Sequence, residues 1–165
     1  MIRYIFGTEE EAESFFKAAK GDMTIGRIEV VGAGAEDLKW HSEQDVLVNI
    51  GYCWAYKVIP GMIIEPSYVM NAKTREIIRI TPVFPVENRI CITSLEPVKE
   101  PIVDYASIYD MELFRIAASH FGVVHSLKIV NGSIEDGETK NINKEEQWAK
   151  VVELVRQCLK NENGC

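Results

Sequence analysis

The spacing of apolar residues in the first thirty positions predicts a strand, a helix and a second strand. Residues 2–6 are mostly apolar and end at Gly7, which is typical of a short buried strand. Thr8 precedes Glu11 by three residues, the spacing of a helix capping box, and apolar positions then recur at helical intervals. Residues 24–31 predict the second strand.

The middle of the chain is rich in β patterns. Residues 35–44 predict a short helix, and residues 45–51 predict a strand that ends in a turn. Three further β-rich runs follow, separated by proline, asparagine and lysine turn signals, at residues 61–65, 76–82 and 89–94.

The last third returns to helical spacing. Residues 109–121 predict an apolar helix, residues 123–130 a strand and residues 131–141 a polar loop. The final helix opens at Asn143, with Glu146 three residues later as its cap partner. Strands and helices interleave at both ends, which indicates helices packed around a mixed sheet. Because we find no internal repeat or linker, we expect one domain over residues 1–165.

Composition narrows the classes of partner. The 165 residues carry a net charge of −7, with 25 acidic side chains against 18 basic ones. This balance, without a cluster of lysines and arginines, argues against a nucleic-acid groove. No apolar run approaches the roughly 20 residues that span a bilayer. We therefore expect a cytoplasmic protein without a membrane partner.

The four cysteines form no C-x-x-C pair and have no histidine at metal-binding spacing. They are typical of free thiols in a reducing compartment. Gly32-Ala-Gly34 lacks the third glycine of a dinucleotide fingerprint. The sequence thus predicts neither a metal nor a cofactor.

Glu112 is the most informative polar residue, because it lies in a segment that otherwise predicts a buried helix. A buried carboxylate needs a partner. That partner is either Arg115, three residues on, or the hydroxyl groups of a ligand. The residue pattern alone leaves both open.

The stretch Tyr-Asp-Met-Glu-Leu-Phe-Arg-Ile-Ala at residues 109–117 carries a resemblance that three further short segments share. It resembles the Met-Glu-Ala helix of the superfamily of purine nucleoside phosphorylases and methylthioadenosine/S-adenosylhomocysteine nucleosidases. Residues 48–51 and 60–64 resemble its Asn-x-Gly and Gly-Asp-Ile-Val stretch, and residues 4–11 its opening strand and acidic turn. Order and approximate spacing hold along nearly the whole chain, as in a short, divergent member.

The resemblance implies a three-layer phosphorylase/hydrolase-like α/β fold, a central mixed sheet flanked by helices. It implies cleavage of the N-glycosidic bond of a purine-type nucleoside, by water or by phosphate. Met111 would pack against the ribose, and Glu112 would hold its 2′- and 3′-hydroxyls. Glu11 would lie near the nucleophile, or would only cap its helix. Asn131 would assist departure of the base.

The resemblance also implies a pocket for the base or an anion, to which we assign Gly7, Gly51, Tyr52, Cys53 and Ser94. Members of the superfamily commonly complete their sites with a neighbouring subunit, so we expect a homo-oligomer, most simply a dimer. We expect the interface between subunits to contain large apolar side chains from segments that resemble loops, namely Tyr52, Trp54, Tyr56 and Phe84.

Three departures from the superfamily matter. Hydrolytic members have an aspartate in the loop where this chain has Asn131, Gly132 or Ser133. Large rings replace small residues at positions 52–56, and the chain is short between residues 21 and 45 and around 66–100. A nucleoside-binding module with little catalysis is therefore the alternative, and an unrelated α/β domain is a third.

Overall fold

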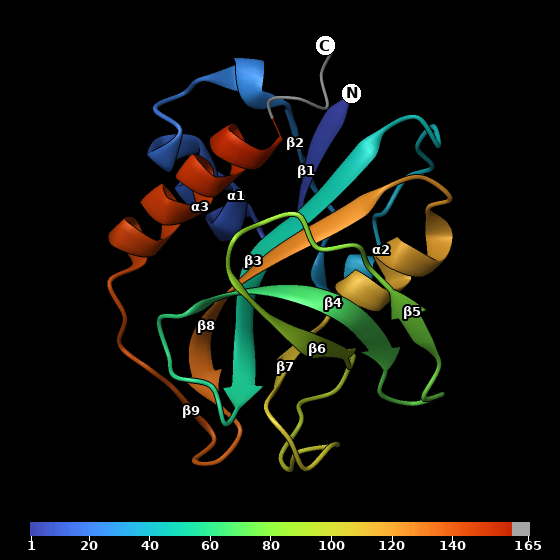
Figure 1. The fold of residues 1–165 in the computed structure, drawn as a ribbon, viewed down its shortest axis with the longest axis vertical. Coiled ribbons are helices and arrows are strands. Elements are labelled where there is room, and N and C mark those ends of the chain that lie inside the picture. Colours follow the sequence, from blue (N-terminus) through green and yellow to red (C-terminus); the bar gives the residue numbers. More distant parts are fainter. Residues whose placement is uncertain (160–165) are drawn as a thin grey trace.

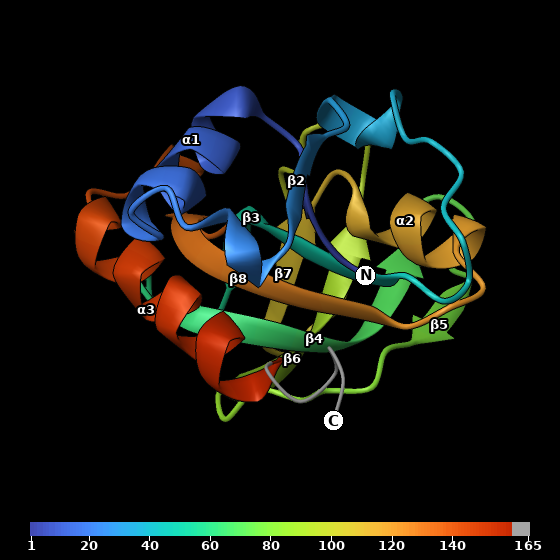
Figure 2. The same ribbon diagram turned by 90° about the horizontal axis from the view of Figure 1, so that it is seen from above.

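The computed structural model describes residues 1–159, which form one mixed sheet with helices on its two faces (Figures 1 and 2). The elements follow in the order β1 (Ile2–Phe6), α1 (Glu9–Ala18), β2 (Arg27–Val30), β3 (Val46–Tyr56), β4 (Ile63–Asn71), β5 (Ile77–Arg79), β6 (Glu87–Thr93), β7 (Ser107–Asp110), α2 (Leu113–Ser119), β8 (Val124–Ser133), β9 (Glu138–Thr139) and α3 (Lys144–Cys158). The expected α/β architecture is confirmed.

The sheet curls so that its central strands close on one another. The order is β2-β1-β3-β7-β6-β4-β8-β9, and β3 also pairs with β8, while β5 pairs with β4. β3 runs parallel to β1 and β8 and antiparallel to β7. β6 runs parallel to both β4 and β7. The long strands β3 and β8 therefore hold the two halves of the sheet together.

Alternate residues along the strands pack against different helices. Phe6, Val48 and Ile129 belong to the core beneath α1 and α3, with Phe15 and Trp148. The next positions along the strands face α2 in two clusters, one containing Cys53, Cys91 and Val130 and the other Ile5 and Leu47. This period of two is the ordinary geometry of a strand. It places helices on both sides of the sheet (Figure 2).

The prediction of a helix at residues 35–44 is wrong. The chain forms a 3-10 turn at Ala33–Ala35 and then runs without a helix to β3. Tertiary contacts hold this polar stretch instead. His41 Nε2 lies 2.8 Å from Glu29 Oε2, and Asp45 Oδ2 accepts a hydrogen bond of 2.7 Å from Arg3 Nε.

The prediction of a helix at residues 109–121 places the start of that helix too early. Residues 107–110 form β7, which pairs with β3 and β6, and α2 covers only Leu113–Ser119. The apolar pair Ile108 and Tyr109 fits a buried strand as well as a helix, and the sheet decides between them. Met111 and Glu112 therefore lie at a strand–helix junction and not inside a helix.

The polar loop expected at residues 131–141 is shorter than predicted. β8 continues to Ser133 and β9 follows at Glu138–Thr139. β4 is longer than its predicted core, since it extends to Asn71. None of the helices within residues 1–159 has the length and apolar character to cross a membrane.

Trp54 explains the bulge in β8. The pairing of β3 with β8 shifts register between Cys53 and Trp54, so that Gly132 and not Asn131 lies opposite Trp54. A Cβ on Gly132 would overlap three atoms of the Trp54 indole. The large ring in β3 and the glycine in β8 are therefore matched, and a side chain at position 132 has no room.

We expect Gly132→Ala to lower the free energy of unfolding by about 1–3 kcal/mol, because the added methyl group must displace the indole. The loss should shrink in a Trp54→Ala background, which a double-mutant cycle by urea denaturation would measure. Additive losses from the two substitutions would show that the ring and the glycine are not coupled.

Candidate active site

The turn from β1 to α1 brings the Glu11 carboxylate to Gly51 and Tyr52, in the middle of β3. Thr8 Oγ1 accepts a hydrogen bond of 3.2 Å from the Glu11 N–H, and Glu11 Oε1 accepts one of 3.1 Å from the Thr8 N–H. This is the expected capping box, so the helix-capping role of Glu11 is confirmed. The second oxygen, Oε2, accepts a hydrogen bond of 2.6 Å from the Tyr52 N–H. Gly51 permits this approach, since a Cβ there would overlap Oε2.

The junction of β7 and α2 is organised by the buried carboxylate of Asp110. Its Oδ1 accepts a hydrogen bond of 2.6 Å from Thr93 Oγ1, and its Oδ2 accepts one of 2.8 Å from the Leu113 N–H. Thr93 Oγ1 in turn accepts a hydrogen bond of 3.0 Å from the Phe114 N–H. Two free N–H groups of the first turn of α2 are thus satisfied by side chains of β6 and β7.

Lys128 of β8 lies beneath this junction and is completely buried. Its Nζ is 3.0 Å from Asp110 Oδ2 and 3.9 Å from Glu112 Oε2. Burial alone would lower the pKa of Lys128, but the adjacent Asp110 and Glu112 carboxylates raise it above its ordinary value. Burial would likewise raise the pKa of Asp110, whereas Lys128 and the Thr93 hydroxyl lower it. The two groups therefore form an ion pair inside the protein.

Glu112 is held against β1 and remains partly accessible. Gly7 lies directly beside its carboxylate, where a Cβ would overlap Oε1. Burial, together with the negative charges of Asp110 and Glu11, raises the pKa of Glu112 to about 7 against the opposing effect of Lys128. The neighbouring Met111 is 39% exposed. The site therefore offers an apolar side chain beside a carboxylate that titrates near neutral pH.

The alternative partner considered for Glu112, Arg115, makes a different contact. Its Nη1 lies 3.4 Å from the Gly34 carbonyl oxygen, to which it donates. Within residues 1–159, the basic group that reaches Glu112 is Lys128.

The residues assigned to the pocket divide between the two faces of β3. Gly7 and Gly51 lie at the acidic cluster, that is, the carboxylates of Glu11, Asp110 and Glu112. The Tyr52 ring points to α3, where its hydroxyl accepts a hydrogen bond of 2.8 Å from Trp148 Nε1, and only its backbone N–H serves the site. Cys53 is buried beneath α2, and burial raises the pKa of its thiol. Ser94 donates a backbone hydrogen bond of 3.0 Å to the Asp110 carbonyl oxygen.

Asn131 lies in the bulge of β8, three residues beyond Lys128, and is half-buried. Its backbone carbonyl accepts a hydrogen bond of 2.7 Å from the Lys140 N–H, and its side-chain amide has no partner within residues 1–159. The two acidic residues of the following turn are exposed and engaged locally. Glu135 Oε1 accepts a hydrogen bond of 2.9 Å from the Lys57 N–H, and Asp136 pairs with Lys140.

Sequence reasoning missed Lys128, Asp110 and Thr93 as parts of the site. One signal pointed to Lys128, because it is the single charged residue in the predicted strand 123–130. A lysine inside a buried strand needs an acidic partner. Its partners are distant in sequence, so only the fold identifies them.

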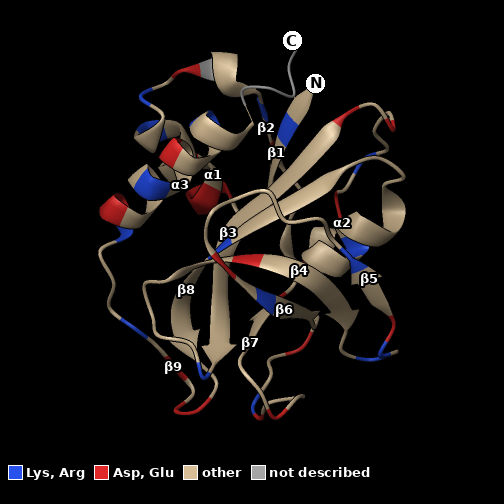
Figure 3. Cartoon of the chain, in the orientation of Figure 1, with Lys and Arg blue, Asp and Glu red and all other residues tan. Residues whose placement is uncertain are grey.

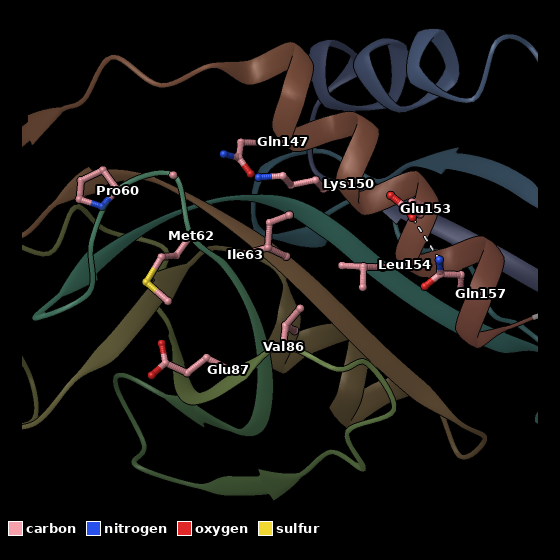
Figure 4. Close-up of a pocket in the computed structure, with 11 residues that line it drawn as sticks. Pro60, Met62, Ile63, Val86, Glu87, Gln147, Lys150, Glu153, Leu154 and Gln157 are labelled. Atoms are coloured by element: carbon pink, nitrogen blue, oxygen red, sulfur yellow. Dashed lines mark hydrogen bonds between the residues drawn. The ribbon is translucent and has the colours of Figure 1, made fainter.

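A separate groove of about 640 Å³ lies between α3 and the start of β4 (Figure 4). Met62, Ile63, Val86 and Leu154 form its apolar part, and Lys150 and Glu153 lie along α3. The residues of the acidic cluster do not line it. Over residues 1–159, basic and acidic positions are interspersed (Figure 3). No group of three His, Cys, Asp or Glu side chains within these described residues is placed to hold a metal ion.

Compared by sequence, the chain matches no protein-family model and no curated protein. Compared by structure, it is similar to a 5′-methylthioadenosine nucleosidase from Arabidopsis thaliana in its apo form, with a TM-score of 0.69 and 15% identity. That match covers 99% of this chain and 96% of the other. The chain has the fold of the methylthioadenosine nucleosidases.

Two further solved structures show the same nucleosidase fold. An MTAN from Chlamydia trachomatis bound to MTA matches with a TM-score of 0.67 and 13% identity, over 95% of this chain and 92% of the other. An MTA/SAH nucleosidase matches with a TM-score of 0.66 and 14% identity, over 99% of this chain and 96% of the other. In each comparison the matched region extends over nearly the whole length of both chains, so the shared fold includes all of the elements that carry the site.

We expect the pKa of Glu112 to be visible in the pH dependence of stability. A carboxyl group whose pKa rises from 4.5 to about 7 on folding holds its proton more tightly in the folded state. Between those values the folded state binds more protons, so the free energy of unfolding falls as pH rises. Glu112→Gln should remove this fall, which is of order 3 kcal/mol at most.

Urea denaturation at pH 4.5 and pH 7.5 would measure the effect, with Glu100→Gln as the matched control at an exposed glutamate. If wild type, Glu112→Gln and the control share one pH slope, Glu112 has an ordinary pKa in the folded protein.

Proposed function

We propose that this chain is an N-ribosyl hydrolase that binds a purine-type nucleoside and cleaves its N-glycosidic bond. The observation that carries the proposal is the Glu112 carboxylate, held at the β7–α2 junction between Gly7, Lys128 and the half-exposed Met111. The nucleosidase fold supports it, as do similar structures that bind MTA and adenine.

Glu112 suits the ribose, because an ionised carboxylate accepts two hydrogen bonds from neighbouring hydroxyl groups. Met111 follows β7 beside it and supplies apolar surface for the sugar ring. Two hydroxyls that donate to Glu112 favour its ionised form, so binding of the nucleoside and loss of the proton are linked.

Glu11 is the candidate that orients the attacking water. Its oxygens accept hydrogen bonds from Thr8 and from the Tyr52 N–H, which fix the carboxylate in place. Oε1 already accepts from both the N–H and the hydroxyl of Thr8, whereas Oε2 accepts only from the Tyr52 N–H within residues 1–159, so Oε2 has a second lone pair with which to accept from a water molecule. The capping role and the catalytic role are therefore compatible in one residue.

Water is favoured over phosphate as the nucleophile. A phosphate site needs cationic or backbone donors that are free to reach it. Arg3, one arginine near the early strands, is bound to Glu29 and Asp45 at the start of β1. Lys128 is buried and paired with Asp110. Because both of these cations are engaged in ion pairs, a hydrolase is a better proposal than a phosphorylase.

The weak point of the site is the leaving group. Position 132 has no room for an acidic side chain, because Trp54 fills the space, and Glu135 and Asp136 are engaged in an exposed turn. The side-chain amide of Asn131, which has no partner within residues 1–159, is the proposed donor to the base. The alternative function, a nucleoside-binding module without catalysis, follows if that donor does not suffice.

Self-association stays a prediction, but not on the residues first chosen for it. Tyr52, Trp54 and Tyr56 lie in β3, and Phe84 is buried. The more exposed aromatic side chains are Trp40 and Phe121, which line one hollow of about 260 Å³. We propose that a homo-oligomer of this chain uses that surface.

We expect Glu112→Gln to weaken nucleoside binding by about 1.5–3 kcal/mol, the scale of hydrogen bonds to a charged group. Titration calorimetry with 5′-methylthioadenosine at pH 8 would measure the loss, with Glu100→Gln as control. Equal affinity in wild type and Glu112→Gln would exclude the ribose-binding role.

We expect base release to be slow and to depend on Asn131. A positioned general acid contributes about 10²–10⁴-fold, a factor that this loop lacks, while losing one preorganised hydrogen-bond donor costs about 10²–10³-fold. Asn131→Ala should therefore reduce release of free base at saturating nucleoside, and Glu135→Gln and Asp136→Asn should not.

Chromatography of a nucleoside panel, with and without phosphate, gives the rates. An inactive Glu135→Gln or Asp136→Asn beside a fully active Asn131→Ala would assign the role to the carboxylate. Binding without release from any nucleoside would favour the binding module.

A further inference from the structure

Three carboxylates share one buried cation at this site. Asp110, Glu112 and Glu11 all interact electrostatically with Lys128, whose side chain has no exposure. Bringing charged groups out of water is costly unless they are paired. One ammonium group compensates one carboxylate, so the three acids compete for it.

Asp110 has the advantage in that competition. Lys128 Nζ lies 3.0 Å from Asp110 but 3.9 Å from Glu112, beyond hydrogen-bonding distance. Asp110 also accepts from the Thr93 hydroxyl and the Leu113 N–H, which stabilise its negative charge. Glu112 is left with the weaker share of the cation and with two negative neighbours.

The groups that face Glu112 come from four elements. Lys128 belongs to β8, Asp110 to β7 and Glu11 to α1, and the uncharged Gly7 closes the β1 side. Two buried thiols lie nearby around the ion pair, Cys53 of β3 and Cys91 of β6, and burial raises the pKa of both. Lys128 is thus the one positive charge that these described groups provide.

We propose that Lys128 is a positioning residue whose ammonium group, divided between Asp110 and Glu112, decides whether Glu112 carries the negative charge with which it accepts ribose hydroxyls. The inference rests on the proposed function for its link to nucleoside binding, but the charge coupling itself concerns only this chain. It gives Asp110 and Lys128 opposite effects on Glu112, although they are partners in one ion pair.

The opposite effects of Lys128 and Asp110 on the charge of Glu112 can be tested by substituting each residue. Lys128→Met removes the cation, so Glu112 should titrate at higher pH, by about one unit or more. Asp110→Asn removes a negative neighbour and frees Lys128 for Glu112, so Glu112 should titrate at lower pH by a similar amount. Lys128→Arg keeps the charge and should restore titration close to that of wild type.

Carbon-13 NMR of the glutamate carboxyl groups in the ligand-free protein would follow the titration, with the Glu112 signal assigned from its loss in Glu112→Gln. Lys150→Met is the matched control, since it removes a lysine from the exposed side of α3. In parallel, calorimetry with 5′-methylthioadenosine from pH 5.5 to 9 would locate the pH midpoint of binding for each variant. Binding should strengthen as pH rises through the Glu112 midpoint and should follow its shifts.

The outcomes separate the inference from the proposed function. If the Glu112 midpoint stays fixed, or moves in the same direction in Lys128→Met and Asp110→Asn, the inference is overturned, even where nucleoside binds. If the midpoint moves as expected but wild type binds no nucleoside, the coupling stands and the proposed function fails. Should Lys128→Met not fold, the downward shift in Asp110→Asn, or its absence, decides the question.

Discussion

The buried ion pair of Lys128 and Asp110 is the interaction on which the site depends. Lys128 comes from β8 and Asp110 from the end of β7, strands that do not pair with each other. Their attraction links two strands that β3, β4 and β6 separate, and breaking such a pair by removing one partner leaves an uncompensated buried charge. The same Asp110 carboxylate accepts from the first turn of α2, so one residue determines where the strand ends and the helix begins.

Glycines allow the carboxylates to come this close to the backbone. Gly7 lies against Glu112 and Gly51 against Glu11, so in both places a backbone segment occupies the space beside a carboxylate. Gly132 has the same relation to the Trp54 ring. The first two glycines create room for acidic groups, whereas the third excludes one. Under the proposed function, the chain therefore combines a well-formed corner for the ribose with a corner that has no acidic side chain for the leaving group.

Under the proposed function, binding and catalysis depend on different parts of the sheet. The proposed ribose corner rests on β1, β7 and β8, each of which pairs with a strand on both sides. The proposed leaving-group corner rests on the β8 bulge, where Asn131 is half-buried, and on the exposed turn residues Glu135 and Asp136 beyond it. In that proposal, changes at the bulge remove catalysis without disturbing the buried ion pair of Lys128 and Asp110.

The sequence by itself determined the elements with strong local signals. The capping box at Thr8 and Glu11, the strands at residues 2–6 and 123–130 and the final helix follow from spacing that acts over a few residues. It also singled out Met111, Glu112 and Gly7, through residue type and order. The tertiary structure decided the rest, because Ile108 and Tyr109 fit a strand or a helix until the sheet pairs them. It alone joined Glu112 to Lys128 and Glu11, since charges far apart in the chain interact only once folding has buried them together.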